Sequence, residues 1–287
     1  MCEIEHILAV KNQLGEGPVW HPEQHCLYWV DIEKKHIYRY WARTGESEKY
    51  SLGIAVTALG FRSSGGFIAA TSQGFAYLDL ESLRLQFILN PEADRKAARM
   101  NDGAVDPNGC FWAGTMSQEP HSALYRLDQF CRLEKMIPGI RVSNGIGWSP
   151  DATKMYFTDS PRRIIYKYDF DRLSSDITNP KTFTEIPNDE GFPDGLTVDT
   201  EGCVWSARWG GGKIVRYDPD GTVESEVILP VTYPTSCTFG GVEMNEMYVT
   251  SAWTALTKQG RAREPQAGDL FRIRTDVVGL REMEFLG

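Results

Sequence analysis

Apolar and polar positions along the chain follow one plan that recurs six times. In each copy a polar residue starts a short apolar run, a turn rich in Asp, Pro, Gly or Ser follows, and an aromatic-rich run comes next. The runs CLYWVD, CFWAGT and CVWSAR, which begin at Cys26, Cys110 and Cys203, fill the same slot in three of the copies. Short runs of this kind, without sustained 3.6-residue periodicity, predict β-strands and little helix.

The spacing of the copies indicates the fold class. Their first polar positions recur with a period of about 40–50 residues, which is typical of β-propellers in which each copy forms one blade. The sequence therefore predicts an all-β fold: a six-bladed β-propeller with four-stranded antiparallel blades, forming a single domain over residues 1–287. The last blade needs an outer strand to close the ring, and either residues 3–10 (EIEHILAV) or residues 281–286 (REMEFL) would supply it. The first positions of the six copies are Glu16, Thr57, Asp102, Asn144, Asp194 and Ser236.

These first positions are expected to meet on one axis, because the innermost strand of every blade lines the central channel of a propeller. All six are polar, and Glu16, Asp102 and Asp194 are carboxylates. A solvated channel mouth would also accept polar residues. Three carboxylates around one narrow axis, however, repel one another unless a cation compensates their charge. Oxygen ligands indicate a hard divalent ion such as Ca²⁺, Mg²⁺ or Mn²⁺, so a metal site is predicted on the axis.

Histidine is absent from these six positions. His21 aligns with Asp106, Ser149 and Asp199 in the turn after the first strand, and we therefore interpret it as a turn residue. A Ser-His-Asp hydrolase arrangement has no support in this pattern.

Composition narrows the partners and the compartment. The net charge of −9 argues against nucleic acid or an anionic membrane as a partner, because phosphate binding needs a basic face. No apolar stretch approaches the roughly 18–20 residues of a membrane-spanning helix, and the N-terminus lacks the features of a signal peptide. We expect a cytoplasmic protein, a monomer or weak homodimer, whose six cysteines are free thiols because there is no CxxC pair.

Five motifs in a fixed order resemble the gluconolactonase/regucalcin family of sugar lactonases, which includes senescence marker protein and luciferin-regenerating enzyme. They run over essentially the whole chain: LGEGPVW (14–20), RMNDGAVDPNGCFWAGTM (99–116), VSNGIGWSPD (142–151), FPDGLTVDTEGCVW (192–205), and FGG (239–241) followed by MYVTSA (247–252). The resemblance implies that Glu16, Asn144 and Asp194 hold one divalent ion, which would be Ca, Mg, Mn, Zn or Fe(II). It further implies that Arg99, Asn101 and Glu119 contact the substrate, while Asp102 lies near the axis.

The implied reaction is the hydrolysis of an aldonolactone, such as glucono-, xylono-, arabinono- or galactonolactone, to the aldonic acid. The ion would polarise the lactone carbonyl, and Asp194 would act as the catalytic base for the attacking water. The alternative is a calcium-binding regulatory protein of the regucalcin type without physiological lactonase activity. A propeller esterase of the paraoxonase type is disfavoured by the lack of a histidine among the six positions, and a plain interaction scaffold by the acidic axis.

Overall fold

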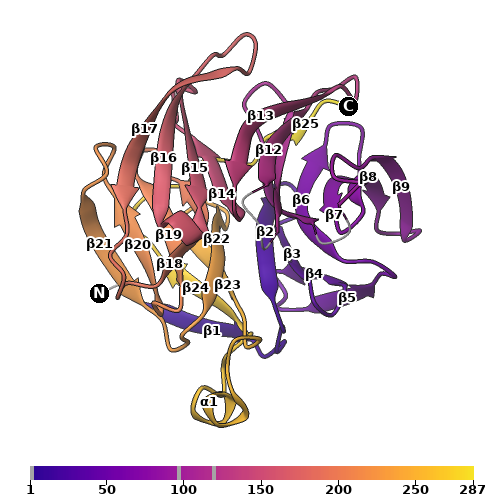
Figure 1. The fold of residues 1–287 in the computed structure, drawn as a ribbon. Coiled ribbons are helices and arrows are strands. Elements are labelled where there is room, and N and C mark those ends of the chain that lie inside the picture. The colour runs from indigo at the N-terminus through magenta and orange to yellow at the C-terminus, as the bar shows by residue number, and fades with distance from the viewer. Residues whose placement is uncertain (1–2, 96–97, 118–120) are drawn as a thin grey trace.

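The computed structural model describes residues 3–95, 98–117 and 121–287 and confirms the predicted fold class. Six sheets surround one axis, and each is built on four antiparallel strands (Figure 1). In five sheets these four strands follow one another in the chain, and in the sixth the outer strand comes from the N-terminus. The second sheet gains a fifth strand, which is parallel, from the C-terminus. The first three sheets are β2 (Gly15–His21), β3 (Cys26–Asp31), β4 (His36–Trp41) and β5 (Ser47–Ser51); β6 (Val56–Arg62), β7 (Phe67–Thr71), β8 (Gly74–Asp79) and β9 (Arg84–Leu89); and β10 (Arg99–Val105), β11 (Phe111–Met116), β12 (Ser122–Leu127) and β13 (Leu133–Ile140).

The remaining sheets complete the circle. In the described residues, helix is limited to one turn of 3₁₀-helix, η1 (Ser160–Arg162), and one short helix, α1 (Lys258–Arg263), as the periodicity predicted. The three sheets are β14 (Ser143–Trp148), β15 (Lys154–Asp159), β16 (Ile164–Phe170) and β17 (Ile177–Glu185); β18 (Phe192–Val198), β19 (Val204–Trp209), β20 (Lys213–Tyr217) and β21 (Val223–Ile228); and β22 (Pro234–Gly240), β23 (Glu246–Ser251) and β24 (Leu270–Arg274), joined by β1 (Ile4–Leu8).

The two ends of the chain have different tasks. The N-terminal strand β1 pairs with β24 and supplies the outer strand of the last blade, so residues 3–10 close the ring. The C-terminal strand β25 (Glu284–Phe285) instead pairs in parallel with the innermost strand β6 of the second blade. The segment before β25 therefore leaves the sixth blade and crosses to the opposite part of the ring, where Leu286 N also donates to Gly109 O at 3.1 Å.

The outermost strand is the most exposed strand of every blade. The second strands, such as β3 and β7, are buried along their whole length, whereas outer strands such as β5 and β21 are mostly exposed. Five apolar clusters fill the spaces between neighbouring blades, and the largest joins the first, fifth and sixth blades through Trp20, Trp205 and Tyr248. Because each blade presents apolar side chains to both neighbours, the blades hold one another in fixed positions around the axis.

The cysteine slot predicted from the repeat is confirmed. Cys26 begins β3, while Cys110 and Cys203 directly precede the equivalent strands β11 and β19. Cys26, Cys110, Cys131, Cys203 and Cys237 are free in the structure, and Cys2 lies outside the described residues.

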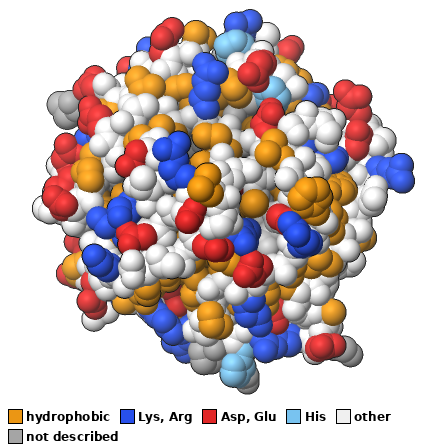
Figure 2. All heavy atoms as spheres, turned by 90° about the horizontal axis from the view of Figure 1, so that it is seen from above, with side chains coloured by type: hydrophobic (Ala, Val, Ile, Leu, Met, Phe, Trp, Pro, Cys, Tyr) orange, Lys and Arg blue, Asp and Glu red, His pale blue; other side chains and the backbone are white. Residues whose placement is uncertain are grey.

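Charged side chains of both signs are spread over one face of the molecule. Figure 2 looks onto the face at which the chain ends in Figure 1, and acidic and basic side chains are interspersed over it without a continuous basic region. Among the described residues, no helix has both the length and the apolar character needed to cross a bilayer.

Candidate metal and substrate site on the propeller axis

All six predicted axial positions lie on the innermost strand of their sheet. Glu16 is on β2, Asn144 on β14 and Asp194 on β18, and the innermost strands contact one another in ring order from β2 to β22 and back to β2. Each of these strands also has a register irregularity at or next to its axial residue, for example between Glu16 and Val19. A bulge redirects a side chain relative to the regular pleat. The repeated bulges therefore help to direct the axial side chains.

Glycine follows the axial residue in four blades, and two of these glycines show why. A Cβ on Gly145 would lie 2.6 Å from Asp194 O, and a Cβ on Gly195 would lie 2.1 Å from Ser236 Oγ. Any side chain there would push apart the innermost strands of neighbouring blades, so only glycine permits the close approach. The SNG and PDG motifs thus combine a polar axial residue with the glycine that narrows the channel around it.

Two buried oxygens on the axis lack a hydrogen-bond partner among the described residues. Asn144 Nδ2 donates to Ser160 Oγ at 2.9 Å, which turns the amide so that Oδ1 remains unpaired. Asp194 Oδ1 is likewise buried without a partner, although the whole residue is only 4% exposed. Glu16, also buried, accepts only a long hydrogen bond of 3.3 Å from Gly17 N. Unpaired buried oxygens are rare because their desolvation is unfavourable, so this set requires a compensating group.

The electrostatics of the axis also indicate a missing positive charge. Burial raises the pKa of Glu16 well above its usual range, and the nearby carboxylates of Asp194 and Asp102 raise it further, while Arg99 opposes the shift. Burial and the charge of Asp102 raise the pKa of Asp194 in the same way, and the amide of Asn144 opposes that shift. Burial raises the pKa of Asp102 to about 6. A bound cation would stabilise the ionised forms of all three groups.

The residue types of the predicted site fit a hard cation. Two carboxylates and one amide oxygen are ligands that Ca²⁺, Mg²⁺ or Mn²⁺ accept. Within the described residues, no group of three or more His, Cys, Asp or Glu side chains is arranged to hold a metal ion, and the predicted set contains only two such residues beside Asn144. The binding of a metal ion by Glu16, Asn144 and Asp194 thus stays a prediction.

The predicted substrate residues on β10 are linked to each other. Arg99 Nη1 donates to Asn101 Oδ1 at 2.7 Å and to Met100 O at 2.9 Å. Asn101 Nδ2 in turn donates to Ser143 O of the next blade at 2.7 Å. Asn101 therefore fixes the guanidinium of Arg99 against the innermost strands, a positioning contact that the motif did not reveal. Glu119 lies outside the described residues.

The interpretation of His21 as a turn residue is confirmed. His21 Nδ1 accepts from Gln24 N at 3.4 Å in the turn after β2. The equivalent Asp106 accepts from Asn108 N and Cys110 N, both at 2.9 Å, in the turn after β10. These residues close turns at the end of the innermost strands, away from the axial positions.

The chain is therefore a six-bladed propeller with an acidic polar centre on its axis. The model of the SMP-30/gluconolactonase/LRE-like region matches residues 14–253, and the chain belongs to this family. Regucalcin of Sus scrofa is 35% identical over 99% of both chains. A protein of Bacillus subtilis (strain 168) provisionally named sugar lactone lactonase YvrE is 34% identical over 96% of this chain and 95% of its own.

Solved structures agree with the sequence comparison. A calcium-binding protein, regucalcin, from Agrobacterium tumefaciens superimposes with a TM-score of 0.94 over 98% of this chain and 96% of its own, at 27% identity. The family resemblance inferred from the five motifs is thereby confirmed.

Proposed function

We propose that this protein is a divalent-metal-dependent sugar lactonase that opens aldonolactones, such as glucono-, xylono-, arabinono- or galactonolactone, to the aldonic acid. The observation that carries the proposal is the pair of buried, unpaired oxygens, Asn144 Oδ1 and Asp194 Oδ1, next to the carboxylate of Glu16 on the axis. Membership of the SMP-30/gluconolactonase/LRE-like family and the similarity to YvrE support the lactone as substrate.

Glu16, Asn144 and Asp194 would hold the ion. Three protein ligands leave positions free on an ion that prefers six or more oxygens, which suits a catalytic site better than a structural one. When bound, the ion supplies Lewis-acid chemistry that polarises the lactone carbonyl and stabilises the developing negative charge on its oxygen.

The side chains of the chain handle the proton and orient the substrate. Asp194 accepts the proton of the water that attacks the carbonyl carbon. The ring C–O bond then breaks, and a proton passes to the ring oxygen, so that lactone and water give one hydroxy acid. Arg99, held by Asn101, donates hydrogen bonds to the substrate, and Glu119 would accept them from its hydroxyls. Such directional donors and acceptors suit a polyol ring.

Calcium binding without turnover is the second candidate. The regucalcin relatives favour it, since one of them is described as a calcium-binding protein. It uses the same three axial ligands, so only an activity measurement separates the two functions.

A lactone panel provides that measurement. The protein is treated with a chelator, each divalent ion is added back, and acid release is followed for several aldonolactones. We expect at least one ion and lactone pair to give turnover far above the buffer rate. A protein that binds calcium yet hydrolyses none of the lactones with any ion would support the regulatory function instead.

A further inference from the structure

The far end of the central channel contains a cavity of about 210 Å³ that the proposed lactonase reaction does not use. Its walls are formed by residues near the ends of the innermost strands, including Val19 on β2, Val105 on β10 and Val198 on β18. Glu16, Asn144 and Asp194 stand in the first halves of their strands, and none of them lines the cavity. The cavity therefore extends from the axial positions Asp102 and Ser236 toward the other end of the axis from the candidate metal site.

The C-terminal segment builds one side of this cavity. Residues 280–283 belong to its lining, and the chain is fixed on either side of them. Leu280 N donates to Val198 O at 3.4 Å on the fifth blade, and β25 pairs with β6 on the second. Thr238 Oγ1 also donates to Glu282 Oε1 at 2.9 Å. The crossing segment thus places the carboxylate of Glu282 inside the channel.

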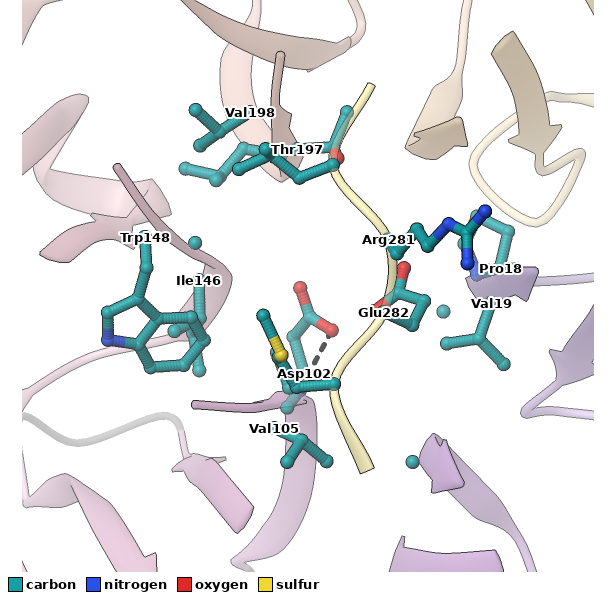
Figure 3. A pocket seen from close by; sticks show the side chains of 18 of the residues that line it. Pro18, Val19, Asp102, Val105, Ile146, Trp148, Thr197, Val198, Arg281 and Glu282 are labelled. Atoms are coloured by element: carbon teal, nitrogen blue, oxygen red, sulfur yellow. Dashed lines mark hydrogen bonds between the residues drawn. The ribbon is translucent and has the colours of Figure 1, made fainter. Parts of the chain in front are cut away.

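Two carboxylates face the cavity, and no ion pair to either of them is found among the described residues. Figure 3 shows those of Asp102 and Glu282 near its centre, while the side chain of Arg281 extends toward Pro18. Burial raises the pKa of Glu282 to about 7, and the charge of Asp102 adds to the shift; no basic side chain among the described residues opposes either effect. Both residues are half-buried, and carboxylates that are withdrawn from water in this way are usually paired with a positive group.

The hydroxyl of Ser236 lies at the same place. Ser236 lines the cavity, is 5% exposed, and its Oγ makes no hydrogen bond within the described part of the chain. It adds a neutral acceptor to the two carboxylates. Together these groups form a polar end rich in acceptors, which is where a donor with positive charge would bind.

The rest of the cavity is apolar and partly aromatic. Ile146 and Trp148 form one wall, with Val105 below them in Figure 3 and Phe61 also in the lining. At the packing density of protein interiors, the volume holds about eight to ten non-hydrogen atoms. A bare metal ion would leave most of this space unfilled, whereas a hydrocarbon chain or ring would bury apolar surface against it.

We propose that this cavity binds a small organic ammonium ion: a primary amine on a short hydrocarbon chain. Asp102 and Glu282 accept hydrogen bonds from the charged nitrogen, and Ser236 offers a third acceptor. The hydrocarbon part lies against Ile146 and Trp148. The site is separate from the proposed lactonase function, because binding requires neither the axial ion nor a lactone.

Calorimetric titration of the full chain, after removal of metal and at about pH 8, tests this proposal with n-pentylammonium chloride as the probe. At that pH the amine is protonated and the carboxylates are largely ionised. We expect one site per chain with a dissociation constant of about 1 mM, as a ligand of this size allows. Pentan-1-ol, which has the same shape without the charge, should bind at least about tenfold more weakly.

Two variants of the crossing segment form a matched pair. Glu282→Gln should weaken pentylammonium binding about tenfold or more, because it removes a charge-assisted hydrogen bond. Glu284→Gln removes the same charge two residues further along the segment, where the side chain is exposed, and should leave the affinity unchanged. Thermal melting of both variants verifies that they are folded. The comparison of amine with alcohol on the unmodified protein does not depend on either variant.

Three outcomes would overturn the proposal. The first is no saturable binding of pentylammonium, and the second is equal binding of the amine and the alcohol, which would make the cavity merely apolar. The third is binding of two calcium ions per chain that falls to one in Glu282→Gln, which would assign the carboxylates to a metal ion. Lactone turnover is not a readout in any arm, so failure here leaves the lactonase proposal untouched, and the reverse also holds.

Discussion

Asp194 and Asp199 stand five residues apart in the fifth blade, and both are buried, yet their surroundings are opposite. Asp199 Oδ1 accepts from Glu201 N and Cys203 N, and its Oδ2 accepts from Trp205 Nε1 and from Arg216. Asp194 Oδ1 has no hydrogen-bond partner in the part of the chain that the structure describes. The same side chain is therefore used at one position to close a turn and anchor an indole, and at the other is left open toward the axis.

This contrast recurs in the third blade. Asp106 Oδ2 accepts from Trp112 Nε1 at 2.8 Å, as Asp199 does from Trp205, whereas Asp102 faces the cavity. In these two blades, two aspartates that lie four or five residues apart thus have different roles. A carboxylate whose oxygens all have hydrogen-bond partners stabilises the blade. A buried carboxylate without partners destabilises the fold unless a ligand binds to it. The predictions below test this division.

The largest expected effect is on catalysis at Asp194. Asp194→Asn keeps the shape and one oxygen ligand but removes the charge and the proton acceptor. With the metal ion in excess, kcat for an aldonolactone should fall by about 10²–10⁴-fold, as is typical for loss of a general base. Steady-state kinetics at saturating ion measure it. A near-normal kcat would reduce Asp194 to a ligand at most.

The free energy of unfolding should depend more on Asp199 than on Asp194. Asp199→Asn weakens acceptance from two backbone amides and an indole and removes one carboxylate partner of Arg216. Because Arg216 keeps its ion pairs with Glu201 and Glu224, the free energy of unfolding should fall by about 1–3 kcal/mol. Asp194→Asn should leave the metal-free protein unchanged or more stable, since its charge is uncompensated. Denaturant unfolding of both variants checks the pair. An equal loss of unfolding free energy in the two variants would contradict the distinction between carboxylates with and without hydrogen-bond partners.

The pH dependence of the metal-free protein should report Asp102. Its pKa of about 6 in the folded protein exceeds the unfolded value of about 4, so the folded state binds more protons in that interval. The free energy of unfolding that this group contributes is thus present below about pH 4 and is lost as the pH rises through 6, by on the order of 2 kcal/mol. Unfolding curves of Asp102→Asn should lack that decrease. An identical pH profile in protein and variant would refute the assignment.

The smallest expected effect is at Arg99, whose contact serves binding. Arg99→Ala should raise KM for hydroxylated lactones by roughly tenfold while lowering kcat less, because the hydrogen bond is made in ground state and transition state alike. A simple lactone without ring hydroxyls provides the control and should scarcely notice the change. A loss of kcat with unaltered KM would place Arg99 in the chemistry itself.

Repetition in the sequence was enough to predict the six blades and their axial residues. Equivalent positions such as Glu16 and Asp194 share a motif, and the ring arrangement of the blades brings equivalent residues of the innermost strands to one axis. Features outside the repeat could not be found this way. Glu282 reaches the channel from a segment that resembled an outer strand, and only the pairing of β25 with β6 shows where it goes. Likewise, Ser160 orients Asn144 by accepting a hydrogen bond from its amide, and no local sequence pattern predicts that contact.

The most direct test of the central claim is a calorimetric titration of the chelated protein with Ca²⁺, Mg²⁺ and Mn²⁺, followed by the same titration of Glu16→Gln, Asn144→Ala and Asp194→Asn. The account predicts one axial ion per chain in the unmodified protein and a loss of affinity of tenfold or more in each variant, about 1.4 kcal/mol or above. An ion that binds equally well to all three variants would show that the axial oxygens do not hold it.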